Sequence, residues 1–222
     1  MKKILFLCDG DNFPEGAFRF IRQIRGNESV VVKGLFFTPI DVEQMITIGF
    51  MPIEGPYAKL KEQEMLDVRK SREMFAKECE EHGIKYLVHE HEESWDRDLF
   101  IKESRFADFV VISEDLFCSD VLDLQPNYFM EEALRVSECP VLVVPEKFRD
   151  IERLAIAYDA GKESMSALKQ FVNLFPDYTD LPAKFVHINN DNKEGIPDKE
   201  LLHEYTSSHF DSLYASSLHF DP

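Results

Sequence analysis

Long hydrophobic runs and clusters of basic residues are both absent from this sequence of 222 residues. No run reaches the length of about 18 apolar residues that a membrane-spanning helix needs. Asp and Glu number 42 against 25 Lys and Arg, so the formal net charge is −17. Because nucleic acids and anionic lipids are bound by clustered Lys and Arg, this balance argues against both as partners.

Cysteines with metal-binding or redox spacing are also missing. No two cysteines form a CxxC motif or a zinc-ligand pair. This pattern favours reduced, packed thiols and a cytoplasmic location. No P-loop, nucleophile elbow or HExxH motif occurs, so we do not expect an enzyme. The scattered cysteines are Cys8, Cys79, Cys118 and Cys139.

The chain repeats its own beginning. Lys2–Ile24 and Glu152–Leu174 align without a gap, so that Asp9 falls on Asp159. Each copy is an apolar run, an aspartate, a small polar loop and an amphipathic helix. We therefore predict a complete domain over residues 1–147 and a partial second copy over residues 148–222, which lacks its last strands. The sequence leaves open whether the short copy is natural or results from a broken reading frame.

Apolar runs of strand length alternate with helical patterns along the first domain. The spacing predicts a long helix over Tyr57–His82, a helix capped by Ser94, and helices after Pro14 and Pro126. The connection Thr38–Pro56 is apolar, and we expect it to fold back onto the protein or a partner. The predicted strands are Ile4–Cys8, Val30–Phe37, Ile84–Val88, Asp108–Ser113 and Pro140–Val144.

The second copy repeats the opening units. Its predicted strands are Leu154–Tyr158, Ala183–Ile188 and Leu213–Leu218, and its predicted helices are Ser164–Leu174 and Asp198–Phe210. Strands that alternate with helices indicate a parallel sheet covered by helices. The predicted fold is therefore α/β, with a doubly wound parallel five-stranded sheet followed by a partial second copy of the same fold.

A reversal of strand order would place a ligand crevice at the carboxyl ends of the first and fourth strands. Asp9 and Ser113 stand at those ends, and no suitable base accompanies them, so we expect a ligand-sized depression without a catalytic dyad. His89–Glu93 reads HEHEE and suits either a solvated acidic loop or, with a third ligand that spacing does not supply, a metal site. We expect no metal. The candidate ligand-binding residues are Cys8, Asp9, Gly10, Phe37, Ser113, Asp159 and Ala160.

Three motifs resemble the universal stress protein family. The first strand ends in Asp-Gly at Asp9, the fourth follows Ala-Asp over Ala107–Ile112, and the fifth reads Cys-Pro-Val-Leu-Val-Val over Cys139–Val144. The resemblance covers residues 1–147 fully and the rest as a partial second copy, as in the tandem form of the family. It implies a nucleotide-binding-like α/β domain with a role in the stress response.

Family members that bind ATP carry Gly-x-x-Gly, nine residues and then Gly-Ser or Gly-Thr after the fourth strand. This chain has no glycine between Gly83 and Gly161, and the segment Ser113–Asp123 is acidic instead. Glycines let backbone N–H groups approach phosphates, whereas carboxylates repel them. We therefore expect no cofactor and poor ATP binding. In the family's binders the aspartate matching Asp9 or Asp159 lies in the adenosine pocket, so ATP or AMP binding there is the alternative to a helix cap or turn.

Three functions remain open. The resemblance without the glycine loop favours a non-catalytic protein that acts through conformation or partner binding. The alternatives are an adenine-nucleotide sensor that uses Asp9 or Asp159, and an enzyme of the adenine-nucleotide α/β class. The family's strand order places the fifth strand at a sheet edge, so we also expect a homodimer through that strand. The residues of this edge are Pro140, Val141, Leu142, Val143 and Val144.

Overall fold

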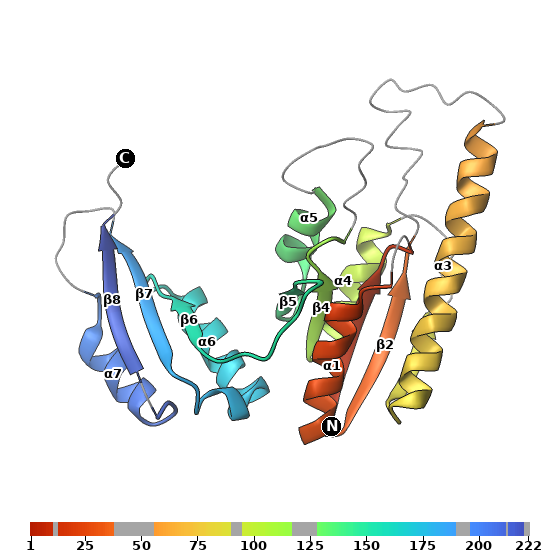
Figure 1. Cartoon of the computed structure of the whole chain (residues 1–222). Helices are drawn as coiled ribbons and strands as arrows, with labels where there is room; N and C mark the ends of the chain where they lie inside the picture. The colour runs from red at the N-terminus through yellow and green to blue at the C-terminus, as the bar shows by residue number, and fades with distance from the viewer. Residues whose placement is uncertain are drawn as a thin grey trace. The chain divides into compact units, whose positions relative to one another are not determined.

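The structure, a computed structural model, describes residues 1–10, 13–37, 56–89, 95–116, 128–189, 196–211 and 213–219. The chain divides into two compact units, Met1–Phe148 and Arg149–Pro222 (Figure 1). Each unit has its own sheet and its own apolar core. None of the helices in these ranges is both long enough and apolar enough to cross a membrane.

Five parallel strands form the sheet of the first unit, and they confirm the predicted α/β class. They are β1 (Lys2–Cys8), β2 (Val30–Phe36), β3 (Lys85–His89), β4 (Phe109–Ser113) and β5 (Val141–Val144). The order is β3-β2-β1-β4-β5, so the chain first moves from β1 to β3 and then returns to the other side of β1. This reversal leaves the carboxyl ends of β1 and β4 next to each other.

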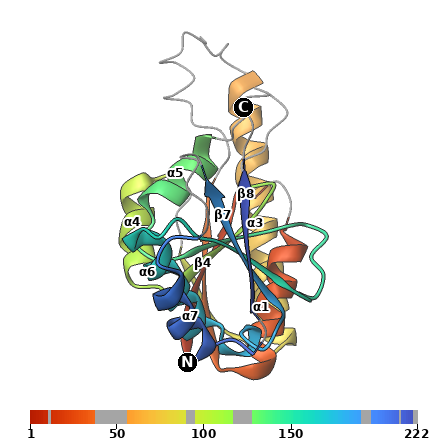
Figure 2. The same cartoon turned by 90° about the vertical axis from the view of Figure 1, so that its left-hand side faces the viewer.

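Helices cover both faces of this sheet (Figure 2). They are α1 (Glu15–Asn27), α3 (Pro56–Glu81), α4 (Arg97–Arg105) and α5 (Tyr128–Val136). Successive side chains of β1 point to opposite faces. Phe6 packs against Phe18 of α1 and Phe75 of α3, with ring centroids 6.1 and 5.5 Å apart. On the other face, Leu7 shares an apolar cluster with Phe100 of α4.

The start of α4 differs from the prediction. Ser94 lies outside the described residues, and the helix is capped by Asp96, whose Oδ1 accepts the N–H of Leu99 at 3.0 Å. A carboxylate at this position satisfies one of the N–H groups that the first helical turn leaves open. The long helix predicted over Tyr57–His82 is confirmed with its bounds moved by one residue to Pro56–Glu81.

Parts of three predicted features fall outside the described residues. These are the apolar connection Thr38–Pro56 before Pro56, the cluster His89–Glu93 after His89, and the acidic segment Ser113–Asp123 after Leu116. Within the part of the chain that the structure does describe, no three His, Cys, Asp or Glu side chains come together in a way that could hold a metal ion.

The second unit contains a smaller parallel sheet. Its elements are β6 (Leu154–Ala157), α6 (Lys162–Leu174), a short 3₁₀ helix (Pro176–Tyr178), β7 (Ala183–Asn189), α7 (Lys199–Ser207) and β8 (Leu213–His219). The strand order is β6-β7-β8. Leu168 of α6 and Leu202 of α7 are buried in one cluster with Phe185 of β7. The helices and strands predicted for this region are therefore present, with bounds shifted by at most three residues.

Candidate functional site

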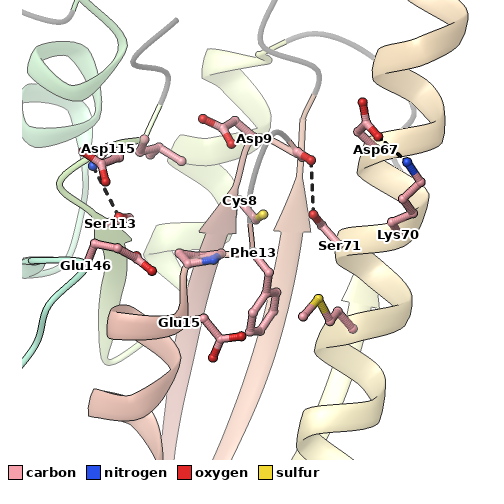
Figure 3. Close-up of a pocket in the computed structure, with 14 residues that line it drawn as sticks. Cys8, Asp9, Phe13, Glu15, Asp67, Lys70, Ser71, Ser113, Asp115 and Glu146 are labelled. Carbon is pink, nitrogen blue, oxygen red and sulfur yellow. Dashed lines mark hydrogen bonds and ion pairs between the residues drawn. The ribbon is translucent and has the colours of Figure 1, made fainter.

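A pocket of about 770 Å³ lies at the carboxyl ends of β1 and β4 (Figure 3). Its floor is made by the last residues of these two strands, and its walls come from the start of α1, the middle of α3 and the chain after β5. The sequence predicts a crevice at this place, because the strand order reverses there. The lining residues are Cys8, Asp9, Gly10, Phe13, Pro14, Glu15, Asp67, Lys70, Ser71, Met74, Ser113, Asp115, Leu116 and Glu146.

Four of the residues singled out from the sequence line this pocket, namely Cys8, Asp9, Gly10 and Ser113. Asp9 is only 7% exposed, and Ser113 only 4%. Gly10 has φ +89°, a conformation that favours glycine, and its carbonyl accepts the Oγ–H of Ser71 on α3 at 3.2 Å. The hydrogen bond between Gly10 and Ser71 holds the end of β1 against α3, at the floor of the pocket.

Phe37 does not line the pocket, contrary to its selection as a ligand-binding residue. Its side chain is fully buried, and its ring lies 5.1 Å from that of Trp95 in the cluster under α4 and α5. The reason is the alternation of β2, which continues beyond the end of the strand. Phe36 points toward α3 and contacts Phe75, so its successor points to the opposite face of the sheet.

Asp159 and Ala160 lie in the second unit and serve the local turn before α6. Oδ1 of Asp159 accepts the N–H of Gly161 at 2.7 Å. A hydrogen bond with Ser164 is the main reason that the pKa of the Asp159 carboxyl lies below its usual value, and the Gly161 bond adds to it. Ala160 has φ +64°, as a tight turn requires. This geometry favours the turn-forming role of Asp159 over ligand binding.

The sequence did not indicate that α3 would supply one wall of the pocket. Asp67, Lys70, Ser71 and Met74 follow one another at helical spacing and face the pocket together. Sequence periodicity locates the neighbouring buried stripe of α3, which includes Val68 and is confirmed by its burial. It cannot show that the adjacent stripe reaches the end of β1, because about 60 residues separate the two segments and only tertiary packing joins them.

Negative charge dominates the lining. Among the described lining residues, five carboxylates face one ammonium group, and that group, Lys70 Nζ, already pairs with Asp67 at 2.6 Å. The hydrogen bond from Lys70 lowers the pKa of Asp67. Burial raises the pKa of the Glu15 carboxyl, and the nearby charge of Glu78 adds to the rise. The carboxylates are Asp9, Glu15, Asp67, Asp115 and Glu146.

The turn after β4 offers no open row of N–H groups to an anion. The N–H of Glu114 donates to the carbonyl of Val144 at 3.0 Å, and the N–H of Leu116 donates to the carbonyl of Ser113 at 3.2 Å. Between them, the N–H of Asp115 donates to Oγ of Ser113 at 3.3 Å. A phosphate cradle needs such donors to point at the ligand. In the described part of this turn, up to Leu116, these N–H groups instead donate hydrogen bonds within the protein.

The fold and this pocket define an α/β protein with a ligand-sized crevice at its topological switch point. Solved structures share the fold. A universal stress protein from Archaeoglobus fulgidus matches with 16% identity and a TM-score of 0.64, over 100% of this chain and 78% of that one. A universal stress protein described as putative, from Pseudomonas aeruginosa, matches with 13% identity and a TM-score of 0.51, over 98% and 74%.

These likenesses concern the fold. No protein-family profile matches the chain, and no curated protein matches it.

Proposed function

We propose that this is a non-catalytic protein of the universal stress type, which acts in the cytoplasm through conformation or partner binding and not through ATP. The observation that supports the proposal is the pocket itself. The part of its lining that the structure describes carries five carboxylates and one lysine that is already paired. A triphosphate that entered would meet like charge at short range and, after β4, amide groups that are already hydrogen-bonded.

We further propose that the second unit is a partial copy of the first. Two observations support this. The sequence from Glu152 aligns with that from Lys2 without a gap, and both units begin as strand, helix, strand, helix, strand. In each unit these three strands are parallel and lie side by side in chain order. The described strands of the second unit, β6, β7 and β8, then correspond to β1, β2 and β3.

Binding of an adenine nucleoside at Asp9 is the second candidate. Asp9 is buried at the end of β1 and borders a pocket of about 770 Å³, within the usual range of small-molecule sites. Adenosine has no phosphate charge, so the acidic lining does not oppose it as it opposes ATP. The same role at Asp159 has less support, because that carboxylate is exposed and occupied by its own turn.

Calorimetry with Mg-ATP and with adenosine separates these possibilities. We expect no saturable signal from Mg-ATP at high micromolar concentrations. A dissociation constant near 1 µM, about −8 kcal/mol, would contradict the proposal. Saturable binding of adenosine that is lost in a folded Asp9→Asn variant would establish the nucleoside sensor. Reproducible turnover of ATP that Asp9→Asn abolishes would establish an enzyme.

The cause of poor ATP binding can be tested by removing charge from the pocket. Asp115→Asn combined with Glu146→Gln neutralises two lining carboxylates without changing their size. We expect this variant to bind Mg-ATP measurably better than the unaltered chain. The matched control is Glu62→Gln with Glu73→Gln, which removes two exposed carboxylates of α3 that do not line the pocket. Equal affinity in both variants would show that the lining charge is not the cause.

A further inference from the structure

The second sheet has an edge at β6 whose backbone is not used within the sheet. Among the described strands, β6 has β7 as its neighbour on one side only. The N–H groups of Leu154 and Tyr158 donate to the carbonyls of Pro182 and Val186, each at 2.9 Å. Because backbone groups alternate along a strand, those of the intervening Ala155 point to the open edge. The same holds for Ala157, so the edge offers two donors and two acceptors.

The side chains around this edge do not suit a partner that brings a helical layer. At the aligned positions of β1, Leu5 and Leu7 are buried under the helices of the first unit, 1% and 0% exposed. The second unit has Ala155 and Ala157 there, both exposed. The large apolar side chains that a covering helix needs are therefore missing from this face of β6.

The helix beside the edge shows the same change. In the first unit α1 contacts β4 and β5, and its residue Phe20 is 4% exposed and packs on Phe148 at 5.4 Å. The aligned residue of α6 is Gln170, which is exposed. A partner that supplied further strands with their own helices would meet the polar side chain of Gln170 here. A partner can therefore use the outward backbone N–H and C=O groups of β6, and a single added strand is enough to hydrogen-bond to them.

We propose that β6 pairs antiparallel with β6 of a second copy of this chain, about a twofold axis through Ile156. In this register Ala155 lies opposite Ala157 of the second copy, and their outward backbone groups form the hydrogen bonds. Arg153 then lies opposite Asp159 of the second copy, on the same face, and the twofold axis makes this pair twice. Both side chains are exposed.

Charge selects this register over its neighbours. Only registers that oppose outward-pointing residues can form the ladder, so the axis passes through Ala155, Ile156 or Ala157. An axis through Ala155 places Arg153 opposite Ala157 of the second copy. An axis through Ala157 places Asp159 opposite Ala155 of the second copy. The axis through Ile156 alone pairs opposite charges, and on the other face it brings Leu154 next to Tyr158 of the second copy.

The contact is self-limiting and short. A twofold pairing uses the same edge on both copies and therefore closes as a dimer. Only a few residues take part, so we expect weak association, with a Kd on the order of 100 µM. The proposal concerns a surface of the second unit and does not depend on the ligand proposed for the pocket of the first.

Disulfide trapping tests the register. The background chain carries Cys118→Ser and Cys139→Ser, and also Val143→Lys to remove the other edge contact that we propose, at β5. Residues opposite each other without shared hydrogen bonds have Cα atoms about 4.5 Å apart, within disulfide range. Ile156→Cys, which lies opposite its own copy without shared hydrogen bonds, should therefore form a covalent dimer on oxidation. Ala155 and Ala157 of the second copy form a hydrogen-bonded pair with Cα atoms about 5.5 Å apart, also within disulfide range, so Ala155→Cys combined with Ala157→Cys should form a covalent dimer as well. Ala155→Cys alone should not, because its copies are offset by two residues.

Charge variants in the same Val143→Lys chain test the ion pairs by sedimentation. Arg153→Glu should weaken association about tenfold, and Arg153→Lys should retain it. Lys199→Glu changes the net charge equally at an exposed residue of α7 and should have no effect. In the unaltered chain, amide exchange at Ala155 and Ala157 should slow as protein concentration rises. A monomer up to about 1 mM, or equal trapping by Ala155→Cys and Ile156→Cys, would overturn the proposal.

Discussion

Because Gly10 has no side chain, the end of β1 at the pocket can pack closely against the long helix α3. Its φ is +89°, and a Cβ built there would lie 2.5 Å from Cγ2 of Val68. We expect Gly10→Ala to destabilise the protein by about 2–4 kcal/mol, because backbone strain and the clash with a helix act together. Thermal or urea unfolding measures this, with Gly26→Ala as the control.

Gly26 lies in α1, has an ordinary φ, and has no atom within 4 Å of a built Cβ. Alanine there should stabilise the protein by about 0.5–1 kcal/mol, through helix propensity and a less flexible unfolded chain. If Gly10→Ala behaved like Gly26→Ala, the close packing of the end of β1 against α3 would be wrong.

The ionised carboxylate of Glu15 lowers the stability of the folded protein at neutral pH. Burial raises its pKa above the usual 4.5, so the folded state holds the proton more tightly than the unfolded state. Stability therefore falls as pH rises from the ordinary pKa through the raised one, and the loss is complete above it. We expect Glu15→Gln to raise the melting temperature at pH 7, with the gain vanishing as pH drops below 4.5.

Glu163 provides the comparison for Glu15. It stands in the first turn of α6, as Glu15 does in α1, and it is likewise exposed, but it does not line the pocket. Glu163→Gln removes a favourable interaction with the helix dipole and should leave stability unchanged or slightly lower at pH 7. A gain of the same size from both substitutions would show that the pocket environment of Glu15 is not responsible.

At the scale of elements, β5 forms the edge of the first sheet. The carbonyls of Pro140 and Val144 accept the N–H groups of Val110 and Glu114, at 2.8 and 3.0 Å, so the backbone of Val143 points outward. The side chain of Val143 is 41% exposed. We propose that this edge pairs with β5 of a second copy. Val143→Lys should then lower the mass found by light scattering at tens of micromolar.

Leu134→Lys is the matched control for Val143→Lys. Leu134 is 50% exposed on α5 and lies off the strand edge, so lysine there should not change the mass.

With both proposed strand contacts intact, at β5 and at β6, copies would join into an open row at high concentration. Val143→Lys and Arg153→Glu should each stop this at dimers, and their combination should give monomers. A monomeric unaltered chain at tens of micromolar would refute the β5 contact.

For the whole molecule, the net charge of −17 makes stability depend on salt. Repulsion among 42 acidic groups acts over distances that salt screens, whereas close ion pairs are affected less. Lys33 and Glu103, for example, lie 2.5 Å apart and are largely shielded from solvent. We expect the melting temperature to rise by a few degrees as NaCl increases from about 0.05 to about 0.5 M. A fall would mean that attractive pairs outweigh the net repulsion.

Much of the fold could be predicted because its signals are local. Apolar runs of strand length located β1 to β5 and β6 to β8, and their alternation with helices gave the α/β class. The ends of the elements were less certain, as at α4, where Asp96 is the cap and not Ser94. Several nearby polar residues can cap a helix, and the sequence does not show which one the packing will use.

The features of the candidate site also fall into local ones, which the sequence predicts, and ones that depend on tertiary packing. The aspartate at the end of β1, the missing glycines and the acidic turn after β4 were determined by the sequence, because each is a property of a few neighbouring residues. The tertiary structure decided that α3 lines the pocket, that Phe37 turns into the opposite core, and that Asp159 is held by its own turn. These outcomes depend on which distant segments pack together, and that is settled by burial of both sheet faces at once.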